Sequence, residues 1–247
     1  MNFLSLFKRK IIYKIKKKIE IDQDVTDDLS LDNLFYKYES DKANIFRIRN
    51  DKGHGFSKFY ANYLHNLRNK KLNILEIGSY AGSSAAAFSK YLPNSKVFCF
   101  DINISNFKYY SKHIEVFGVD INNIDKVKKI LQKIFLKNNF EKFDLIIDDG
   151  SHKLSDILLG LKFFFKYLKN DGIFVIEDYM HPNYYETNRD IDHIFIDELL
   201  QNLREKKTFP SSKISFYDQK YLIEKIKEIN TFKGNLRDSD ICFIKKS

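Results

Sequence analysis

Two carboxylates, a glycine, a hydroxyl and an imidazole follow one another directly after an apolar run at residues 143–147. The run, FDLII, is typical of a strand that is buried on both faces of a parallel sheet. Adjacent carboxylates beside such a strand are costly to bury unless something pairs with them. In open α/β sheets, ligands bind just past the carboxyl ends of the strands. The segment therefore predicts a functional site made of Asp148, Asp149, Gly150, Ser151 and His152.

A second acidic pair ends the apolar run at residues 173–178. The two runs are expected to be neighbouring strands, so Asp149, Glu177 and Asp178 would lie roughly 5 Å apart and repel one another unless a cation sits between them. Oxygen ligands without cysteine favour Mg²⁺ or Mn²⁺ over zinc. His152 could be a fourth ligand, but it is more useful as a base, because imidazole accepts a proton near neutral pH.

A glycine-containing loop at residues 78–82 follows another expected strand, 72–77, and precedes a small-residue helix, 83–91. Its glycines let the backbone approach a ligand, and the helix N-terminus offers free N–H groups. The phosphate-binding patterns G-x-x-x-x-G-K-[ST] and G-x-G-x-x-G are both absent from this loop. Asp101 ends the next strand, about twenty residues further on, where an acid can bind ribose hydroxyls. Asp120 ends a third expected strand in the same way.

Strand-like and helix-like segments alternate along most of the chain, which predicts an α/β fold with a doubly wound parallel sheet. We expect one domain at residues 40–247, preceded by a helical extension at residues 1–39. The expected strands are 72–77, 97–101, 115–120, 143–147, 173–178, 214–217 and 241–244. The expected helices are 21–41, 56–68, 83–91, 123–138, 155–169, 190–206 and 219–229, besides one within the first twenty residues.

The composition, with 43% hydrophobic and 15% aromatic residues, is that of a folded protein. Cys99 and Cys242 stand in apolar runs and read as buried thiols, which makes a reducing cytoplasm the expected location. The sequence has neither a membrane-spanning apolar stretch nor the pattern of a secretory signal. The net charge is +9, and about six of these charges fall in the first twenty residues. The remainder is only mildly basic, so we expect no nucleic-acid partner.

The first twenty residues form a basic amphipathic pattern. Apolar residues recur there at helical spacing, at Phe3, Leu4, Phe7, Ile11, Ile15 and Ile19. Such a helix can lie on an anionic membrane surface, which would place the protein at the inner face of the membrane. Alternatively, its apolar stripe can pack on its own domain or on a second subunit. We favour this packing over membrane binding. Peripheral membrane contact and a homo-oligomer both stay open.

The loop and the strand ends together resemble a class I S-adenosylmethionine-dependent methyltransferase, with a seven-stranded Rossmann-like sheet. Glu76, Gly78 and Gly82 match the family's motif E/D-x-G-x-G-x-G, with Tyr80 in place of the middle glycine. The resemblance implies that Glu76 and the loop, Ser79 included, face the amino-acid part of the cofactor. It further implies that Asp101 holds the ribose and that Asp120 lies near the adenine. Asp148 is left as a cofactor contact without a firm role.

A narrower resemblance covers about residues 40–180. FDLIIDDGSHKLSD followed by GIFVIEDY is similar to the metal-dependent sugar O-methyltransferases of macrolide pathways and bacterial surface-glycan clusters. Ser40-Asp41-Lys42 and Gly53-His54-Gly55-Phe56 with Tyr60 resemble that group's signature D-K-x-x-x-H-x-Y-x-x-x-Y, with a longer gap and with Phe56 in place of the first tyrosine. The resemblance implies that Asp149, Glu177 and Asp178 ligate Mg²⁺ and that His152 is the base. The acceptor would be a sugar or nucleotide-sugar hydroxyl, used in capsule or lipopolysaccharide synthesis.

Three other functions compete with this one. N-methyltransferases of nucleic acid or protein resemble one another in a D/N-P-P-Y motif after the fourth strand, where this chain has Asp-Asp-Gly-Ser-His. A catechol-type O-methyltransferase would share the metal but act on phenols. A non-catalytic protein that binds a glycan or a membrane would keep only the fold. Two further features also stay open: His54 is either a site residue or a loop histidine, and residues 181–185 are either a lid or a plain surface loop.

Overall fold

The computed structural model describes residues 3–26, 29–191 and 193–247, in which helices and strands alternate. The elements of its first half are α1 (Phe3–Ile15), β1 (Ile19–Glu20), α2 (Leu31–Lys37), β2 (Ile45–Phe46), β3 (Asp51–Lys52), α3 (Ser57–Leu64), η1 (His65–Leu67), β4 (Asn73–Ile77), α4 (Ser83–Tyr91), β5 (Lys96–Asp101), η2 (Ile104–Asn106), β6 (Tyr109–Tyr110) and β7 (Ile114–Gly118). Those of its second half are α5 (Ile124–Asn138), β8 (Phe143–Asp148), α6 (Leu154–Phe164), η3 (Phe165–Tyr167), β9 (Leu168–Glu177), α7 (His181–Tyr184), η4 (Glu186–Asn188), α8 (Ile196–Arg204), α9 (Phe216–Lys225), β10 (Ile226–Lys233) and β11 (Asp240–Lys246).

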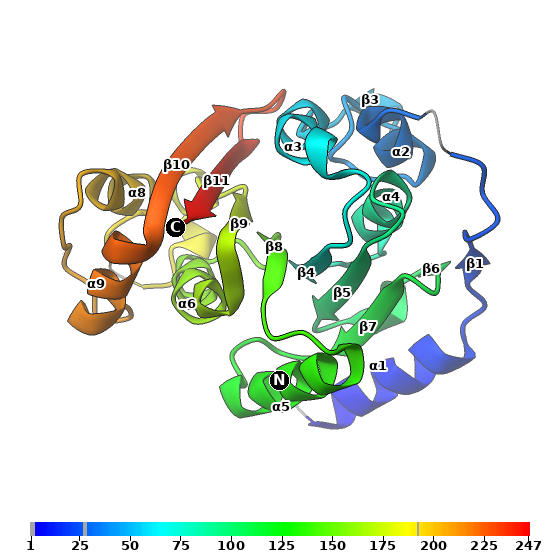
Figure 1. The fold of residues 1–247 in the computed structure, drawn as a ribbon, viewed down its shortest axis with the longest axis horizontal. Helices are drawn as coiled ribbons and strands as arrows, with labels where there is room; N and C mark the ends of the chain where they lie inside the picture. Colours follow the sequence, from blue (N-terminus) through cyan, green and yellow to red (C-terminus); the bar gives the residue numbers. More distant parts are fainter. Residues whose placement is uncertain (1–2, 27–28, 192) are drawn as a thin grey trace.

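The central sheet of the described residues has seven strands in the order β10-β11-β9-β8-β4-β5-β7 (Figure 1). Neighbouring strands from β9 to β7 are parallel, whereas β11 runs antiparallel to both β9 and β10. The short pairs β1–β6 and β2–β3 lie outside this sheet. The predicted fold class, a doubly wound seven-stranded sheet, is confirmed.

Helices cover both faces of the sheet because its inner strands are apolar on both sides. Leu75 and Ile77 of β4 face the layer that contains α5, α6, α8 and α9. Ile74, which precedes Leu75 and points to the opposite face, packs in the layer that contains α2 and α4. Two cores therefore lie back to back across the sheet, and the short strands are held rigidly between them.

The strand order reverses between β4 and β8. From β4 the chain winds outward to β5 and β7, and from β8 it winds the other way to β9. The carboxyl ends of these parallel strands meet along one edge, and a crevice opens where the winding direction changes. The loops after β4, β5, β8 and β9, which carry the candidate site residues, are therefore brought together.

Packing is continuous across residues 39 and 40, where the sequence suggests a boundary. Ser30 caps α2, because its hydroxyl accepts a hydrogen bond from the Asn33 N–H. Leu34 and Phe35 of α2 are fully buried in the same core as Ile74 of β4. The segment before residue 40 is thus part of the core that supports the sheet.

Several expected elements differ from the observed ones. The helix expected at 21–41 is only α2, and residues 27–28 within it lie outside the described residues. The strand expected at 214–217 is wrong, because Ser215 caps α9 by accepting a hydrogen bond from the Asp218 N–H. The helix expected at 219–229 ends at Lys225, and the edge strand β10 follows. The helix expected at 190–206 is shorter, α8, and residue 192 lies outside the described residues.

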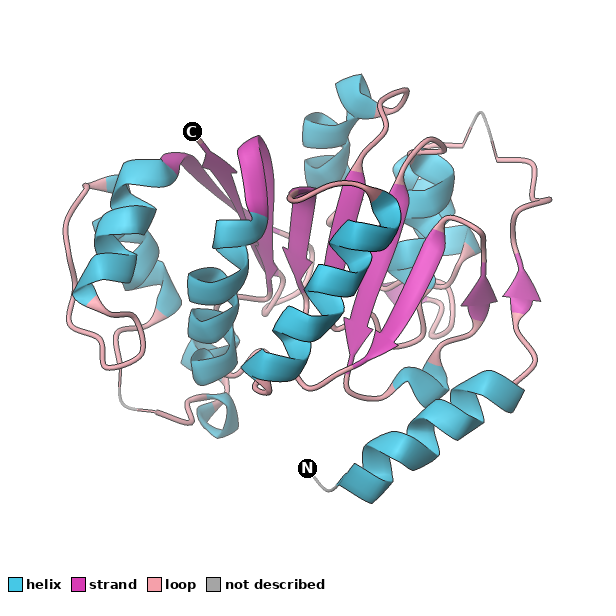
Figure 2. Cartoon of the chain, turned by 60° about the horizontal axis from the view of Figure 1, so that its bottom comes forward, coloured by secondary structure: helices cyan, strands magenta, loops and turns pink. Residues whose placement is uncertain are grey.

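The N-terminal helix α1 lies at the periphery, beside the edge of the sheet near β7 (Figures 1 and 2). Its apolar stripe does not pack on the domain as favoured above: Phe7, Ile11 and Ile15 are 55, 45 and 77% exposed. Ile19 belongs to β1 instead of the helix and is exposed as well. Within the described residues, we find no helix that is both long and apolar enough to cross a membrane.

The burial of α2 gives a prediction for stability. Replacing Phe35 by alanine should lower the free energy of unfolding by about 3–5 kcal/mol, because its ring packs edge-on against Tyr60 and Phe88 and leaves a cavity. The matched control is Tyr36→Ala on the exposed side of the same helix, which should change it by less than about 0.5 kcal/mol. Urea unfolding followed by circular dichroism measures both changes. Equal effects of the two substitutions would contradict the conclusion that α2 is part of the core that contains Ile74.

Candidate functional site

Three potential metal ligands meet where β8 and β9 end. Asp149, His152 and Asp178 each offer a donor atom, and these atoms all lie within 4.8 Å of one another. His152 Nε2 is 3.8 Å from Asp149 Oδ1. Asp149 and His152 follow β8 directly, and Asp178 follows β9, so the parallel pairing of these strands fixes the distance between the two loops. Two carboxylates and an imidazole thus face one small volume.

The backbone is strained at two of these three residues. His152 has φ 56° and Asp178 has φ 50°, in the left-handed region that residues with a side chain seldom adopt. Such strain persists only where the surroundings impose it, and it gathers at functional sites. Here it turns both side chains toward the same point at the end of the strands.

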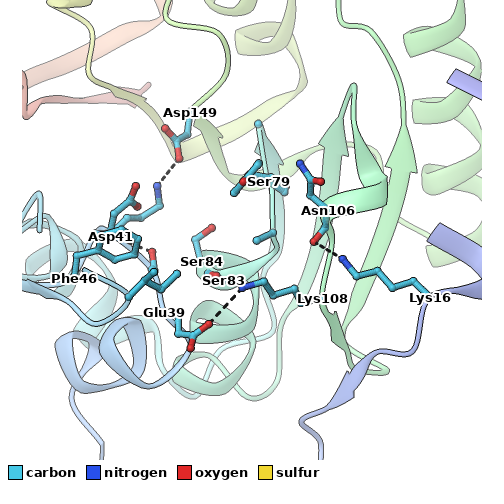
Figure 3. Close-up of a pocket in the computed structure, with 16 residues that line it drawn as sticks. Lys16, Glu39, Asp41, Phe46, Ser79, Ser83, Ser84, Asn106, Lys108 and Asp149 are labelled. Atoms are coloured by element: carbon cyan, nitrogen blue, oxygen red, sulfur yellow. Dashed lines mark hydrogen bonds and ion pairs between the residues drawn. The ribbon is translucent and has the colours of Figure 1, made fainter. Parts of the chain in front are cut away.

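A buried lysine supplies positive charge next to this group. Lys42, from the segment that follows α2, donates hydrogen bonds to Asp149 Oδ2 at 2.5 Å and to Glu177 Oε2 at 2.6 Å. Figure 3 shows the first of these contacts as the dashed line from Asp149. Tyr60 of α3 donates to Glu177 Oε1 at 2.5 Å. Both oxygens of Glu177 are therefore engaged on the side of the site away from His152.

The ligand set expected from the sequence, Asp149, Glu177 and Asp178, stays a prediction. The structure brings Asp149 and Asp178 together with His152, whereas Glu177 lies outside this three-donor group. The reason is that Lys42 and Tyr60 hold the Glu177 carboxylate. The sequence predicts a cation between the converging carboxylates. Between Asp149 and Glu177, that cation is the Lys42 ammonium.

Burial strongly affects the ionisation of this pair. Desolvation, followed by the charge of Asp149, raises the pKa of Glu177 to about 8, although Lys42 opposes the shift. Desolvation likewise raises the pKa of Asp149. Burial alone would lower the pKa of Lys42, but the two carboxylates raise it well above its ordinary value. Lys42 therefore stays charged and keeps the acids beside it ionisable.

His54 approaches the third carboxylate. Its Nδ1 is 3.5 Å from Asp178 Oδ1 and 2.9 Å from the Ser239 hydroxyl. Burial would lower the pKa of His54, yet the nearby Asp178 carboxylate raises it to about 9. His54 is thus a site residue by position. Asp178 Oδ1 itself is buried and has no hydrogen-bond partner among the described residues, and an unsatisfied carboxylate oxygen in a group of three donors fits a divalent cation.

The glycine loop lies directly against the acidic segment. Gly78 has φ 86°, and a Cβ there would collide with the carbonyl oxygen of Asp149. Gly82 has φ 77° and precedes α4, and a Cβ there would collide with the ring of Phe107. Only glycine allows this close approach of β4, β8 and the η2 segment. The sequence predicts that these glycines let the backbone approach a ligand, and this stays a prediction. In the structure, Gly78 lets the loop approach the backbone of Asp149, and Gly82 lets it approach the ring of Phe107.

Two adjoining cavities flank the loop. The larger, about 590 Å³, has Asp101 and Asp120 at one end and Asp149 and His152 at the other. The smaller, about 320 Å³, is lined by Lys42 and by the loop and first turn of α4: Ser79, Tyr80, Ser83 and Ser84 (Figure 3). Gly78, Tyr80 and Asp149 line both cavities. An elongated ligand therefore has room from the end of β5 to the three-donor group.

Two acids are held in place around these cavities. The carboxylate of Asp101 accepts hydrogen bonds from the backbone N–H groups of Tyr80 at 2.7 Å and Asn103 at 2.5 Å. Glu76 lies buried under the loop, where Ser84 donates to its Oε1 at 2.5 Å. Its Oε2 has no hydrogen-bond partner among the described residues. A fixed acid at one end and an unsatisfied buried acid next to Ser84 at the other fit a nucleoside that carries an amino-acid group.

Asp148 is the last residue of β8, and its carboxylate packs against Gly160 of α6, outside the lining of both cavities. Desolvation, with the charge of Asp149, raises its pKa to about 8. The cofactor contact expected for Asp148 stays a prediction.

Two groups of site residues had no assigned role in the sequence. Lys42 and Tyr60 belong to the upstream signature quoted above, but nothing in their spacing shows that they pair with Glu177. The segment 181–185 forms α7 beside the site, with the His181 ring 4.8 Å from that of His152 and 4.7 Å from that of Tyr185. The position of His181 and Tyr185 favours a wall of the site over a plain surface loop.

Comparison with known proteins supports the resemblance to methyltransferases. Residues 75–179 match the family model of a methyltransferase domain. The resemblance is confirmed over this segment. The chain is also 30% identical over 155 residues to the L-olivosyl-oleandolide 3-O-methyltransferase of Streptomyces antibioticus, and 28% identical over 159 residues to the 8-demethyl-8-(2-methoxy-alpha-L-rhamnosyl)-tetracenomycin-C 3'-O-methyltransferase of Streptomyces olivaceus. Each match covers 60% of this chain and 36% of the relative, so the chain spans about a third of the length of these relatives.

A solved structure confirms the fold. The methyltransferase MycE of mycinamycin biosynthesis, in complex with Mg, SAH and mycinamycin VI, superposes with a TM-score of 0.68 at 19% identity. The match covers 89% of this chain and 55% of MycE.

The lysine bridge gives a prediction for stability without metal. In the presence of EDTA, Lys42→Met should lower the free energy of unfolding by about 3–5 kcal/mol, because it leaves two buried carboxylates without their cation. The loss should be larger at pH 8 than at pH 5, where protonation of the acids relieves it. Lys52→Met, on the exposed strand β3, is the control. Thermal unfolding measures both variants, and a Lys42 variant as stable as the control at pH 8 would refute the bridge.

Proposed function

We propose that this protein is an S-adenosylmethionine-dependent and divalent-metal-dependent O-methyltransferase that acts on a sugar hydroxyl. The observation that carries the proposal is the three-donor group Asp149, His152 and Asp178 at one end of a cavity whose other end holds Asp101. A metal held by this group and a nucleoside held at the other end would lie within the reach of one methyl transfer. The methyltransferase match and the sugar-modifying relatives support it.

The cofactor would lie along the two cavities. Asp101, fixed by two backbone N–H groups, would accept hydrogen bonds from the ribose hydroxyls. Asp120 would stand near the adenine. Ser79, Ser83 and the buried Glu76 with its unsatisfied oxygen would receive the amino-acid group. The sulfonium would then stand between the loop and Asp149, which lines both cavities.

Asp149 and Asp178 would hold Mg²⁺ or Mn²⁺, with Glu177 as a third ligand once Lys42 moves and with His152 beside the ion as the base. A bound divalent ion supplies a lowered pKa and a fixed orientation for the acceptor hydroxyl. His152 takes the hydroxyl proton in the transition state. The hydroxyl oxygen attacks the methyl carbon, the C–O bond forms, and the C–S bond breaks with its electron pair left on sulfur. The protein mainly aligns the two reactants.

The acceptor would bind beside His152 and α7. The His181 ring packs against the rings of both His152 and Tyr185, and aromatic faces bind the apolar face of a sugar. The two relatives described above are O-methyltransferases of compounds that carry an olivosyl or a rhamnosyl group. For this chain we propose a nucleotide-activated sugar or a glycan of capsule or lipopolysaccharide synthesis as the acceptor.

An acceptor screen tests the function. The protein, labelled S-adenosylmethionine and Mg²⁺ should transfer label to a member of a panel of nucleotide sugars, and EDTA should abolish the transfer. Catechols form the second panel: transfer to catechols alone would replace the sugar by a phenol. If calorimetry finds no binding of S-adenosylhomocysteine with or without Mg²⁺, the enzyme proposal fails.

The two possible roles of His152 can be separated. If His152 is the base, His152→Ala should lower kcat by at least about 10²-fold while the Kd for Mn²⁺, measured by electron paramagnetic resonance, stays within severalfold. If it is an essential ligand, the Kd should rise by about tenfold or more. Asp178→Asn provides the comparison, because loss of a ligand carboxylate should weaken Mn²⁺ binding in either case. Turnover within severalfold of the unmodified protein would exclude His152 as the base.

A further inference from the structure

The helix α1 has two sides with different partners. Its inward side is anchored to the segment after β5: Arg9 donates to the Ile102 carbonyl at 3.0 Å, and Lys16, just beyond the helix, donates to the carbonyls of Ser105 and Asn106 at 3.1 and 3.2 Å. Figure 3 shows the contact between Lys16 and Asn106. The ring of Tyr13 packs edge-on against buried Phe107. Cationic and aromatic side chains therefore fix the orientation of the helix on the domain.

The opposite side, which we call the outer face of α1, is apolar. It consists of Phe7, Ile11, Ile12 and Ile15, whose side chains are 38–77% exposed. Phe7, Ile11 and Ile15 follow one another at intervals of four residues and so form one stripe along the helix. A stripe that the domain leaves exposed, on a helix already anchored by its other side, is available to an external partner.

Lysines border this face. Lys8 and Lys14 lie on either side of the stripe, Lys17 follows the helix, and all three side chains are exposed. The sequence has no acidic residue before Glu20, and within the described chain these three ammonium groups have neither an ion pair nor a hydrogen bond. The inward cations Arg9 and Lys16 are engaged with carbonyls, so it is the outward cations that remain for a partner.

We propose that the outer face of α1 binds the surface of a bilayer that contains anionic lipids. Apolar side chains would enter the boundary between headgroups and acyl chains, and the flanking lysines would stay among the phosphates. A second copy of the chain fits less well, because pairing two such faces brings their lysines together without any acid to neutralise them. Nucleic acid would use the lysines but would leave the apolar stripe in water.

Vesicle sedimentation tests the proposal. The full chain should sediment with vesicles of phosphatidylcholine that contain phosphatidylglycerol, and not with pure phosphatidylcholine, and high salt should release it. Ile11→Ser with Ile15→Ser should weaken binding by at least about tenfold, as three to four methylene equivalents leave the bilayer on each side chain. Lys8→Glu with Lys14→Glu should also weaken it by at least about tenfold.

The matched controls are on α9 and in the segment just before it, which also expose aromatic residues and lysines. Phe216→Ser with Tyr217→Ser, and Lys213→Glu with Lys220→Glu, make the same kinds of change away from α1 and should leave vesicle binding unchanged. Circular dichroism and S-adenosylhomocysteine binding show whether each variant is folded, so the result does not depend on turnover. Binding that the controls reduce as much as the α1 variants would overturn the proposal. So would a dimer that dissociates on Ile11→Ser with Ile15→Ser while the parent protein ignores anionic vesicles.

Discussion

The site depends on one electrostatic constraint, which is that several carboxylates are buried at the carboxyl edge of the sheet. Glu177 and Asp149 are surrounded by apolar strands, and desolvation pushes the pKa of both upward. Lys42 lies between them and donates to each, so the two acids are held at a fixed spacing. A buried lysine is itself costly, and it is stable here because two acids raise its pKa. Each charge is thus tolerated only because the others are present, which makes the arrangement sensitive to the loss of any one of them.

The constraint explains why the backbone around the site is unusual. Gly78 must be glycine because its neighbour is the carbonyl of Asp149, and this close approach brings the loop after β4 against the loop after β8. His152 and Asp178 adopt left-handed backbone to turn their side chains toward the same volume. The topology supplies the rest, since the reversal of strand order between β4 and β8 opens the crevice at that point. The strained backbone and the reversal of strand order therefore bring side chains to the same place, the three-donor group at the ends of β8 and β9.

The sequence allowed prediction of whatever depends on local pattern. Apolar runs predict the inner strands. The acids that follow those runs, Asp101, Asp149 and Asp178, are predicted as site residues because parallel strands bring their carboxyl ends to one edge of the sheet. The pairing of side chains could not be predicted in this way. Glu177 and Asp178 are adjacent, yet their side chains point to opposite sides and have different partners. Glu177 contacts Lys42 and Tyr60, whereas Asp178 contacts His54 and belongs to the three-donor group. The strand expected at 214–217 fails because a capping serine outweighs four residues of strand propensity.

Residues upstream of the matched segment 75–179 complete the site. Lys42, His54 and Tyr60 come from the short signature before the sheet, and each contacts a different side of the acid cluster: Lys42 reaches Asp149 and Glu177, Tyr60 reaches Glu177, and His54 reaches Asp178. The acids at the edge of the sheet would otherwise carry unbalanced negative charge in a crevice. Two cations of this signature, Lys42 and His54, offset the charge, and the hydroxyl of Tyr60 donates a hydrogen bond to it. The longer gap between Lys42 and His54 is accommodated by the β2–β3 hairpin, so the insertion changes the surface without moving the two cations from the acids. The upstream segment is therefore part of the chemistry of the site, and the spacing of its motif reflects three separate contacts with it.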